Sequence, residues 1–314
     1  MQTPPYIELH THSGYSFLNG ASHPEELVIR ARELGYPALA LTDHDGVYGS
    51  MEFARAAREM GVQPITGAEI TVRGCLLPQA DYTHSSRSDE PVDRWHLTLL
   101  VETPKGYANL SRLLTEAHRT SPRGAPSLHL DMLFERTEGL ILLTGCRKSP
   151  LLKALEDSTT TGEAFAKRLI NAFGPKSIFV ELQDNRVRGD QNRMRRLSRL
   201  ADQLGLPVIV TGNVHYHHPE RHPLQDVLTA IRHRSTLDSS HKRRRPNAEF
   251  YLASPSEMAN RFASRPDALI NTLRVTERCA AFDLTEDLGY VFPDFGGNEH
   301  GTAMEVLATV TRAA

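Results

Sequence analysis

The chain is poor in cysteine, and this scarcity excludes one class of small protein. Cys75, Cys146 and Cys279 are the three cysteines in 314 residues, and no two of them form a Cys-x-x-Cys pair. A disulfide framework would need more cysteines at closer spacing. We therefore expect reduced thiols and a location in the cytoplasm.

Long apolar runs and an excess of charge of one sign are also missing. No stretch of about eighteen apolar residues occurs, and the N-terminus lacks the basic and then apolar pattern of a signal peptide. We therefore expect no membrane association. Lysine plus arginine total 36 against 38 for aspartate plus glutamate, so contact with nucleic acid requires a local basic patch. No Gly-x-Gly-x-x-Gly or Walker motif follows a predicted strand, which argues against dinucleotide or nucleoside-triphosphate binding.

The first two thirds of the chain alternate short apolar strands with amphipathic helices. Strands are predicted at 6–9, 38–42, 64–66, 96–101, 139–144, 177–180 and 207–210, and the main helices at 24–34, 48–60, 106–118, 161–173 and 188–204. Continuously apolar strands are typical of a parallel sheet covered by helices. Six or seven such units before residue 216 favour an α/β barrel, closed or nearly closed, over an open sheet.

From His222 onward the pattern changes to helices alone. They are predicted at 223–233, from 254, at 266–282 and in a short segment after 301, and polar segments at 79–94 and 235–247 are interpreted as loops. We expect a barrel over residues 1–220 and a helical extension over 221–314.

Fifteen histidines are the unusual feature of the composition, and two of them open the chain as His10-Thr11-His12. In a strand, positions i and i+2 share a face, so these two imidazoles converge. Other polar residues end successive strands, at the rim where parallel barrels build their sites. The rim set is His10, His12, Asp43, His44, Glu69, Cys146, Glu181, Asn213 and His215.

Imidazoles, a thiol and a carboxylate together suit Zn²⁺, Mn²⁺ or Fe²⁺ better than Mg²⁺ or Ca²⁺. His96 begins its strand instead of ending it, and a hairpin after Glu69 would bring it to the same mouth. Taken singly, each residue has a simpler interpretation: a surface histidine, a small buried Cys146, or a Glu69 paired with an arginine. Their number at one rim favours a metal site.

The same residues lie in motifs that resemble the PHP (polymerase and histidinol phosphatase) domain. The motifs are His10-Thr11-His12-Ser13, residues 42–46, Gly67-Ala68-Glu69, His96, Gly145-Cys146 and Asn213-Val214-His215. Residues 15–18, 180–183 and 215–232 resemble, more narrowly, the N-terminal PHP domain of the error-prone branch of bacterial C-family DNA polymerases. Such polymerases continue into palm, fingers and thumb, and we expect no polymerase active site in this chain.

The resemblance implies a distorted (β/α)₇ TIM-like barrel that holds up to three divalent metal ions. It implies one ion at His10, His12, Glu69 and Asn213, a second at Glu69, His96 and Cys146, and a third at Asn19, His44 and His215. Active relatives usually have Asp or His at position 19, and many have Asp at position 213. Because an amide brings no charge, we expect the first and third sites to bind more weakly here.

The implied chemistry is metal-assisted phosphoester hydrolysis, as a 3′→5′ exonuclease on single-stranded or 3′-end DNA in replication or repair. We predict catalytic roles for Glu69, His44 and Asp43, and substrate contacts for Glu181 and Arg147. A catalytically weakened module docked on a polymerase body or on replication and repair proteins is one alternative. A free-standing phosphatase acting on a small substrate is another. The basic run 242–245 is either a contact to a nucleic-acid backbone or a solvated loop.

Overall fold

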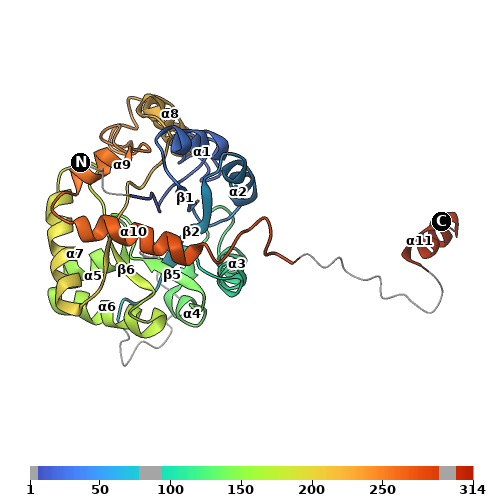
Figure 1. Ribbon diagram of the computed structural model, residues 1–314, viewed down its shortest axis with the longest axis horizontal. Helices are drawn as coiled ribbons and strands as arrows, with labels where there is room; N and C mark the ends of the chain where they lie inside the picture. The colour runs from blue at the N-terminus through green and yellow to red at the C-terminus, as the bar shows by residue number, and fades with distance from the viewer. Residues whose placement is uncertain (1–5, 78–93, 290–301, 314) are drawn as a thin grey trace.

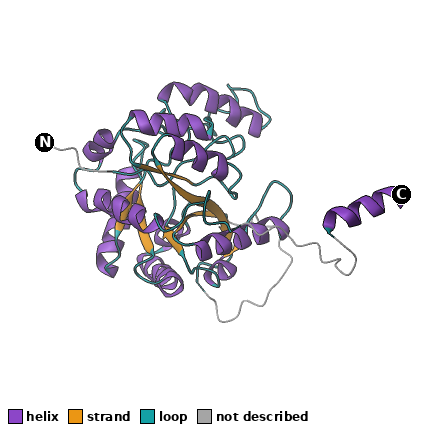
Figure 2. Cartoon of the chain, turned by 45° about the vertical axis from the view of Figure 1, so that its right-hand side comes forward, coloured by secondary structure: helices purple, strands orange, loops and turns teal. Residues whose placement is uncertain are grey.

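A curled mixed sheet surrounded by helices forms the body of the protein (Figure 1). The computed structural model describes residues 6–77, 94–289 and 302–313. Six strands follow the order β1-β2-β3-β5-β6-β7, and β4 pairs with β2. Figure 2 shows the strands gathered at the centre with helices outside them. The strands are β1 (Ala38–Leu41), β2 (Gln63–Arg73), β3 (Trp95–Val101), β4 (Leu128–His129), β5 (Leu140–Leu143), β6 (Ile178–Leu182) and β7 (Val208–Val210).

The helices confirm the predicted alternation, with small shifts at their ends. α1 begins after the N-cap residue His23, and α9 begins with the capping box of Ser254 and Glu257. Each helix in the described part of the chain is too short or too polar to cross a membrane. The helices are α1 (Pro24–Glu33), α2 (Ser50–Glu59), α3 (Pro104–Arg119), α4 (Leu130–Phe134), α5 (Pro150–Asp157), α6 (Thr159–Phe173), α7 (Asp190–Leu204), the 3₁₀ turn η1 (Pro219–Arg221), α8 (His222–Arg232), α9 (Pro255–Arg261), α10 (Pro266–Cys279) and α11 (Ala303–Ala313).

The N-terminal segment closes the ring between β1 and the residues that follow β7. On one side, Ala40 donates its N–H to the carbonyl of Glu8 at 3.0 Å. On the other side, His12 donates its N–H to the carbonyl of Val214 at 2.8 Å. The strand predicted at 6–9 is therefore present as isolated parallel bridges at Glu8 and Thr11 and not as a regular strand. This closure places His10 and His12 inside the ring.

The sheet is mixed, which corrects the expectation of a purely parallel one. β3 runs antiparallel to both β2 and β5, and His96 lies opposite Thr71. β2 continues past Glu69 to Arg73, and the chain returns along β3. The predicted hairpin is thus confirmed, and it brings His96 to the mouth beside Glu69. Of the loop predicted at 79–94, residues 79–93 lie outside the described residues.

Helix α10 covers the end of the ring opposite the histidines. Val275 and Cys279 pack in one apolar cluster with Ile7, Leu9 and other interior residues of the strands. The hydroxyl of Thr272 accepts the N–H of Ile7 at 3.0 Å. The first segment, which carries the His-x-His pair, is therefore held by α10. α10 lies in the predicted extension but packs into the barrel, so a boundary between two units at residue 220 stays a prediction.

We predict that Thr272→Val lowers the free energy of unfolding by about 1–3 kcal/mol, because it leaves the buried N–H of Ile7 without an acceptor. Thr276→Val is the matched control. It makes the same substitution one turn later, where the hydroxyl bonds only within the helix, to the carbonyl of Thr272. Urea denaturation measures both variants. Equal losses would show that the Thr272–Ile7 hydrogen bond does not hold the segment.

Candidate metal centre

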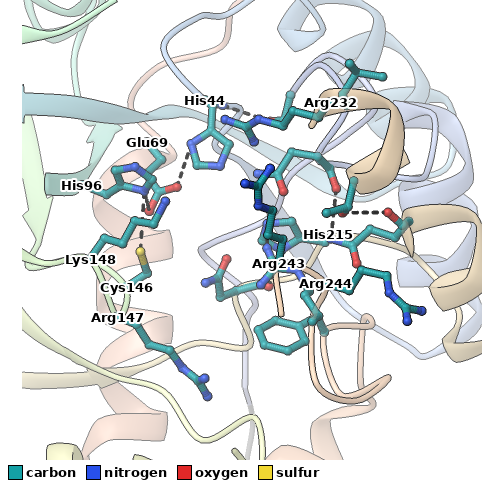
Figure 3. A pocket seen from close by; sticks show the side chains of 18 of the residues that line it. His44, Glu69, His96, Cys146, Arg147, Lys148, His215, Arg232, Arg243 and Arg244 are labelled. Carbon is teal, nitrogen blue, oxygen red and sulfur yellow. Dashed lines mark hydrogen bonds and ion pairs between the residues drawn. The ribbon is translucent and has the colours of Figure 1, made fainter. Parts of the chain in front are cut away.

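Glu69 lies at the centre of the mouth, with four imidazoles around its carboxylate. Its Oε2 is 2.9 Å from Nδ1 of His44 and 3.5 Å from Nε2 of His12. Its Oε1 is 3.3 Å from Nδ1 of His96 and 3.5 Å from Nε2 of His10. Figure 3 shows His44, Glu69 and His96 in a continuous chain of contacts. Residues from the N-terminal segment, the end of β1, β2 and β3 therefore meet at one side chain.

Four buried polar atoms at this place have no hydrogen-bond partner among the described residues. They are Nε2 of His10, Nε2 of His12, Oε1 of Glu69 and Oδ1 of Asn213. A buried polar atom without a partner costs about 1–3 kcal/mol, so four at one point are expensive unless something else binds them. All four are electron-pair donors. They belong to the residues predicted for the first metal ion, and a divalent cation fits this donor set.

Further ligand atoms gather in overlapping groups around Glu69. Within each group the atoms lie within 4.8 Å of one another, which is close enough to share one ion. Sγ of Cys146 lies 3.7 Å from Nδ1 of His96, at the edge of the third group (Figure 3). The groups are His10, His12 and Glu69; His12, His44 and His215; and His44, Glu69 and His96.

The two asparagines differ in how they meet the centre. Asn213 has a φ of 49°, in the left-handed region that asparagine tolerates better than most residues, and is 7% exposed. Its backbone carbonyl oxygen lies 2.8 Å from Nδ1 of His215. Asn19 lines the cavity near the mouth, and its backbone N–H donates to the carbonyl of Ser16. Both side chains are neutral amides, so neither position adds negative charge to the centre.

Burial and mutual contact shift the titration of the centre. Burial alone raises the pKa of Glu69, but His96, His44 and His10 outweigh it and hold that pKa well below its usual range. Burial and the neighbouring His44 lower the pKa of His12 well below its usual value. Burial, Arg245 and His12 do the same to the pKa of His215. Burial lowers the pKa of His10, but Glu181 and Glu69 outweigh it and raise that pKa to about 10, so a metal ion at His10 has to displace a proton.

Three predicted roles are not what the geometry favours. The carboxylate of Asp43 accepts hydrogen bonds from the N–H and hydroxyl of Ser13 and from the hydroxyl of Ser16, so it is fully engaged behind the ligands. The hydroxyl of Ser16 in turn accepts the backbone N–H of His44. Arg147 lines the cavity but is bound to Asp190 at 2.6 Å. Asp43 thus contacts the ligands only through serine hydroxyls, and its catalytic role stays a prediction. A substrate contact by Arg147 has to compete with Asp190.

Glu181 is likewise engaged behind the centre and not open to a substrate. It is 1% exposed, and its Oε1 lies 2.7 Å from Nδ1 of His10. Its other oxygen accepts the N–H of Gly145 at 3.0 Å, and Gln183 donates to Oε1 at 2.8 Å. A carboxylate on the second nitrogen of a ligating histidine fixes the ring and its tautomer. The geometry therefore favours a positioning role for Glu181 at His10, and the substrate contact stays a prediction.

A cavity of about 440 Å³ opens above the centre, and cations line its outer part. Phe17, which is 80% exposed, also lines it. Figure 3 shows Glu69, His96 and Cys146 on one side, with Arg232 and Arg244 across from them. We call the cations of this cavity other than Arg245 the basic rim: Arg147, Lys148, Arg232, Arg243 and Arg244.

The sequence analysis missed two residues of the site. Ser16 links Asp43 to His44, and its hydroxyl lies 3.3 Å from Nδ1 of His12. Arg245 hydrogen-bonds the ring of His215 through its guanidinium, and burial lowers the pKa of Arg245 to about 10. Arg245 stands in a polar run with no periodicity. Its contact reaches across thirty positions of the chain, so no local pattern marks it.

Comparison with known proteins finds a family model and curated relatives that match this chain. The model of the PHP domain matches residues 8–185. The chain is 40% identical over 291 residues to an error-prone DNA polymerase of Symbiobacterium thermophilum, covering 87% of this chain and 25% of that protein. It is 32% identical over 277 residues to DNA polymerase III subunit alpha of Treponema pallidum, covering 87% and 23%. The chain thus spans about a quarter of the length of these curated relatives.

Among solved structures, one similar fold comes from Bacteroides vulgatus. It is a two-domain protein described as containing a predicted PHP-like metal-dependent phosphoesterase. The TM-score is 0.40 at 16% identity, and the match covers 67% of this chain and 52% of that one.

We predict that Glu181→Gln weakens metal binding by about 10- to 100-fold with no substrate present, because the ring of His10 loses its charged partner. Isothermal titration of the metal-stripped protein with Mn²⁺ measures the affinity. Glu59→Gln makes the same substitution at an exposed position of α2 and should leave it unchanged. An unaltered affinity in Glu181→Gln, with only a raised KM, would restore the substrate contact in place of the positioning role.

Proposed function

The chain belongs to the PHP domain family, and from that premise we propose that it is a metal-dependent phosphoester hydrolase that acts on DNA as a 3′→5′ exonuclease. One observation carries the proposal. Among the residues that the structure describes, ligand atoms of His10, His12, Glu69 and Asn213 lack hydrogen-bond partners. They lie beneath an open cavity that Glu69 and Asn213 line. Carbonyl, carboxylate and imidazole donors in this arrangement serve a divalent cation better than they serve the fold alone.

Two ions would share Glu69 as a common ligand. His10, His12 and Asn213 would complete the ligands of one ion. His96 and Cys146 would complete those of the other, which leaves His44 facing the cavity. Zn²⁺, Mn²⁺ or Fe²⁺ suits these donors. When bound, such cations activate water and neutralise the charge that develops on a phosphate during hydrolysis.

The residues of the chain itself supply alignment around that centre. Asp43 holds the hydroxyl of Ser16, which fixes the backbone of His44 and lies beside His12. Glu181 holds the ring of His10. Small misplacements of aligned groups cost catalytic rate steeply, so we assign these two buried acids to orientation. His44 is 20% exposed and faces the cavity, which makes it the histidine best placed to exchange a proton with a substrate oxygen.

The basic rim and Phe17 favour a single-stranded nucleic acid as the substrate. Cations on the rim would meet the phosphodiester backbone, although Arg147 and Arg244 are already paired with carboxylates. An aromatic ring that is 80% exposed offers a stacking surface for a base. A small phosphomonoester would use the floor of the cavity but would not need an exposed ring at its edge. Curated relatives are DNA polymerases, so we propose that the chain works in the cytoplasm beside a polymerase body or another replication or repair protein.

A second candidate is a catalytically weakened PHP module that serves as a structural partner. Asn19 and Asn213 favour it, because both positions carry a neutral amide at the mouth. Weak metal binding at these positions would leave the fold intact and the chemistry slow. The orphaned donor atoms count against this reading, because a module without metal has no use for them.

We predict that the Mn²⁺-loaded protein shortens a 5′-labelled single-stranded oligonucleotide from its 3′ end. His12→Ala should lower the rate by about 100-fold or more, because it removes a ligand from the centre. His129→Ala is the matched control, since His129 lies on β4 outside the centre. Gel electrophoresis of the products gives the rates, and a phosphomonoester is assayed in parallel.

The outcomes separate the candidates. Cleavage of the phosphomonoester alone would identify a small-molecule phosphatase. A third outcome is that the metal-loaded protein cleaves neither substrate and His12→Ala behaves identically. This result would contradict hydrolysis and favour the structural module.

A further inference from the structure

Arg245 is fixed above the histidines by its loop, which is anchored on both sides. Arg244, next to it, donates to Asp226 of α8 at 2.6 Å. Phe250, which follows Arg245 in the chain, accepts the backbone N–H of His215 at its carbonyl oxygen at 2.8 Å. The guanidinium carbon of Arg245 lies 4.1 Å from the centroid of the Phe250 ring. Stacking on one side and a tethered backbone on the other hold this side chain over the mouth.

The hydrogen bonds of His215 determine which nitrogen faces Arg245. Nδ1 lies 2.8 Å from the carbonyl oxygen of Asn213, which only accepts, so Nδ1 carries the proton. Nε2 therefore presents a lone pair, and Nη2 of Arg245 donates to it. A metal ion would need that same lone pair. One nitrogen cannot bind a guanidinium N–H and a cation together.

The candidate third metal position, beside Nε2 of His215, has little negative charge around it. His12 and His44 stack with ring centroids 4.3 Å apart, and His215 lies 4.4 Å from His12. These three imidazoles form one of the candidate ligand groups, and Asn19 at the mouth adds only an amide. A cation here would have neutral ligands and a guanidinium beside it. By contrast, the other two groups both contain Glu69.

We propose that Arg245 fills the third cation position itself, so that the centre binds two metal ions and not three. The guanidinium supplies a fixed positive charge next to His215 in place of an exchangeable ion. The inference rests on the metal centre proposed above but not on its activity. It also goes against the family pattern, which predicts a third ion at Asn19, His44 and His215.

The test is the number of Mn²⁺ ions bound per chain, measured by elemental analysis after equilibration at saturating metal and by calorimetric titration. The unaltered protein should bind two. Arg245→Met keeps an apolar stem over Phe250 but removes every donor, and it should bind three. Lys242→Met loses the same charge from an exposed position of the same loop and should bind two.

A measurement on the unaltered protein covers the case in which Arg245→Met does not fold. With Zn²⁺ at saturation, ¹⁵N spectra of the imidazoles should show metal-bound shifts for His10, His12 and His96 but a hydrogen-bonded Nε2 for His215. Three ions in the unaltered protein, or a metal-bound shift at His215, would overturn the inference and leave the hydrolase proposal standing. Two ions in a folded Arg245→Met would overturn it as well. No ion in any variant would contradict the metal centre and the proposed function together.

Discussion

The structure depends on one buried carboxylate placed among four imidazoles. Glu69 is 1% exposed, which by itself opposes ionisation, yet the surrounding histidines keep it ionised. In the described part of the chain, its own Oε1 and three donor atoms beside it lack hydrogen-bond partners, and this would destabilise a fold that had no other use for them. The rest of the barrel can be understood as what holds this arrangement together, from α10 below to the basic rim above.

Closure of the ring explains how distant parts of the chain meet at this point. The N-terminal segment lies between β1 and the residues after β7, and its backbone bonds to both. Because it bridges the two ends of the sheet, His10 and His12 come within reach of residues more than 200 positions away, such as His215. Thr272 of α10 holds the same segment from the opposite end. Fold stability and site geometry thus share the same few hydrogen bonds.

Much of the centre could be predicted from the sequence, because strand periodicity decides which side chains share a face. His10 with His12, and His96 through the hairpin after Glu69, followed from that rule and from the rim of the barrel. The positioning roles that we propose for Glu181 and Asp43 could not be predicted. In the sequence, a carboxylate that contacts a substrate has the same position at a strand end as one that contacts the second nitrogen of a metal-ligating histidine. The short elements α5, β4 and α4 were also not predicted, because their few apolar residues lack a clear period. Arg245 depended on a loop path that only tertiary packing defines.

The central claim is that the two oxygens of Glu69 hold divalent ions. The most direct measurement is a crystal structure of the Mn²⁺-soaked protein with anomalous data at the manganese edge. We expect one anomalous peak bonded to Glu69, His10 and His12 and a second bonded to Glu69 and His96, with metal–oxygen distances at Glu69 of about 2.0–2.2 Å. Anomalous density elsewhere with none at Glu69, and imidazoles still in direct contact with its oxygens, would contradict the account.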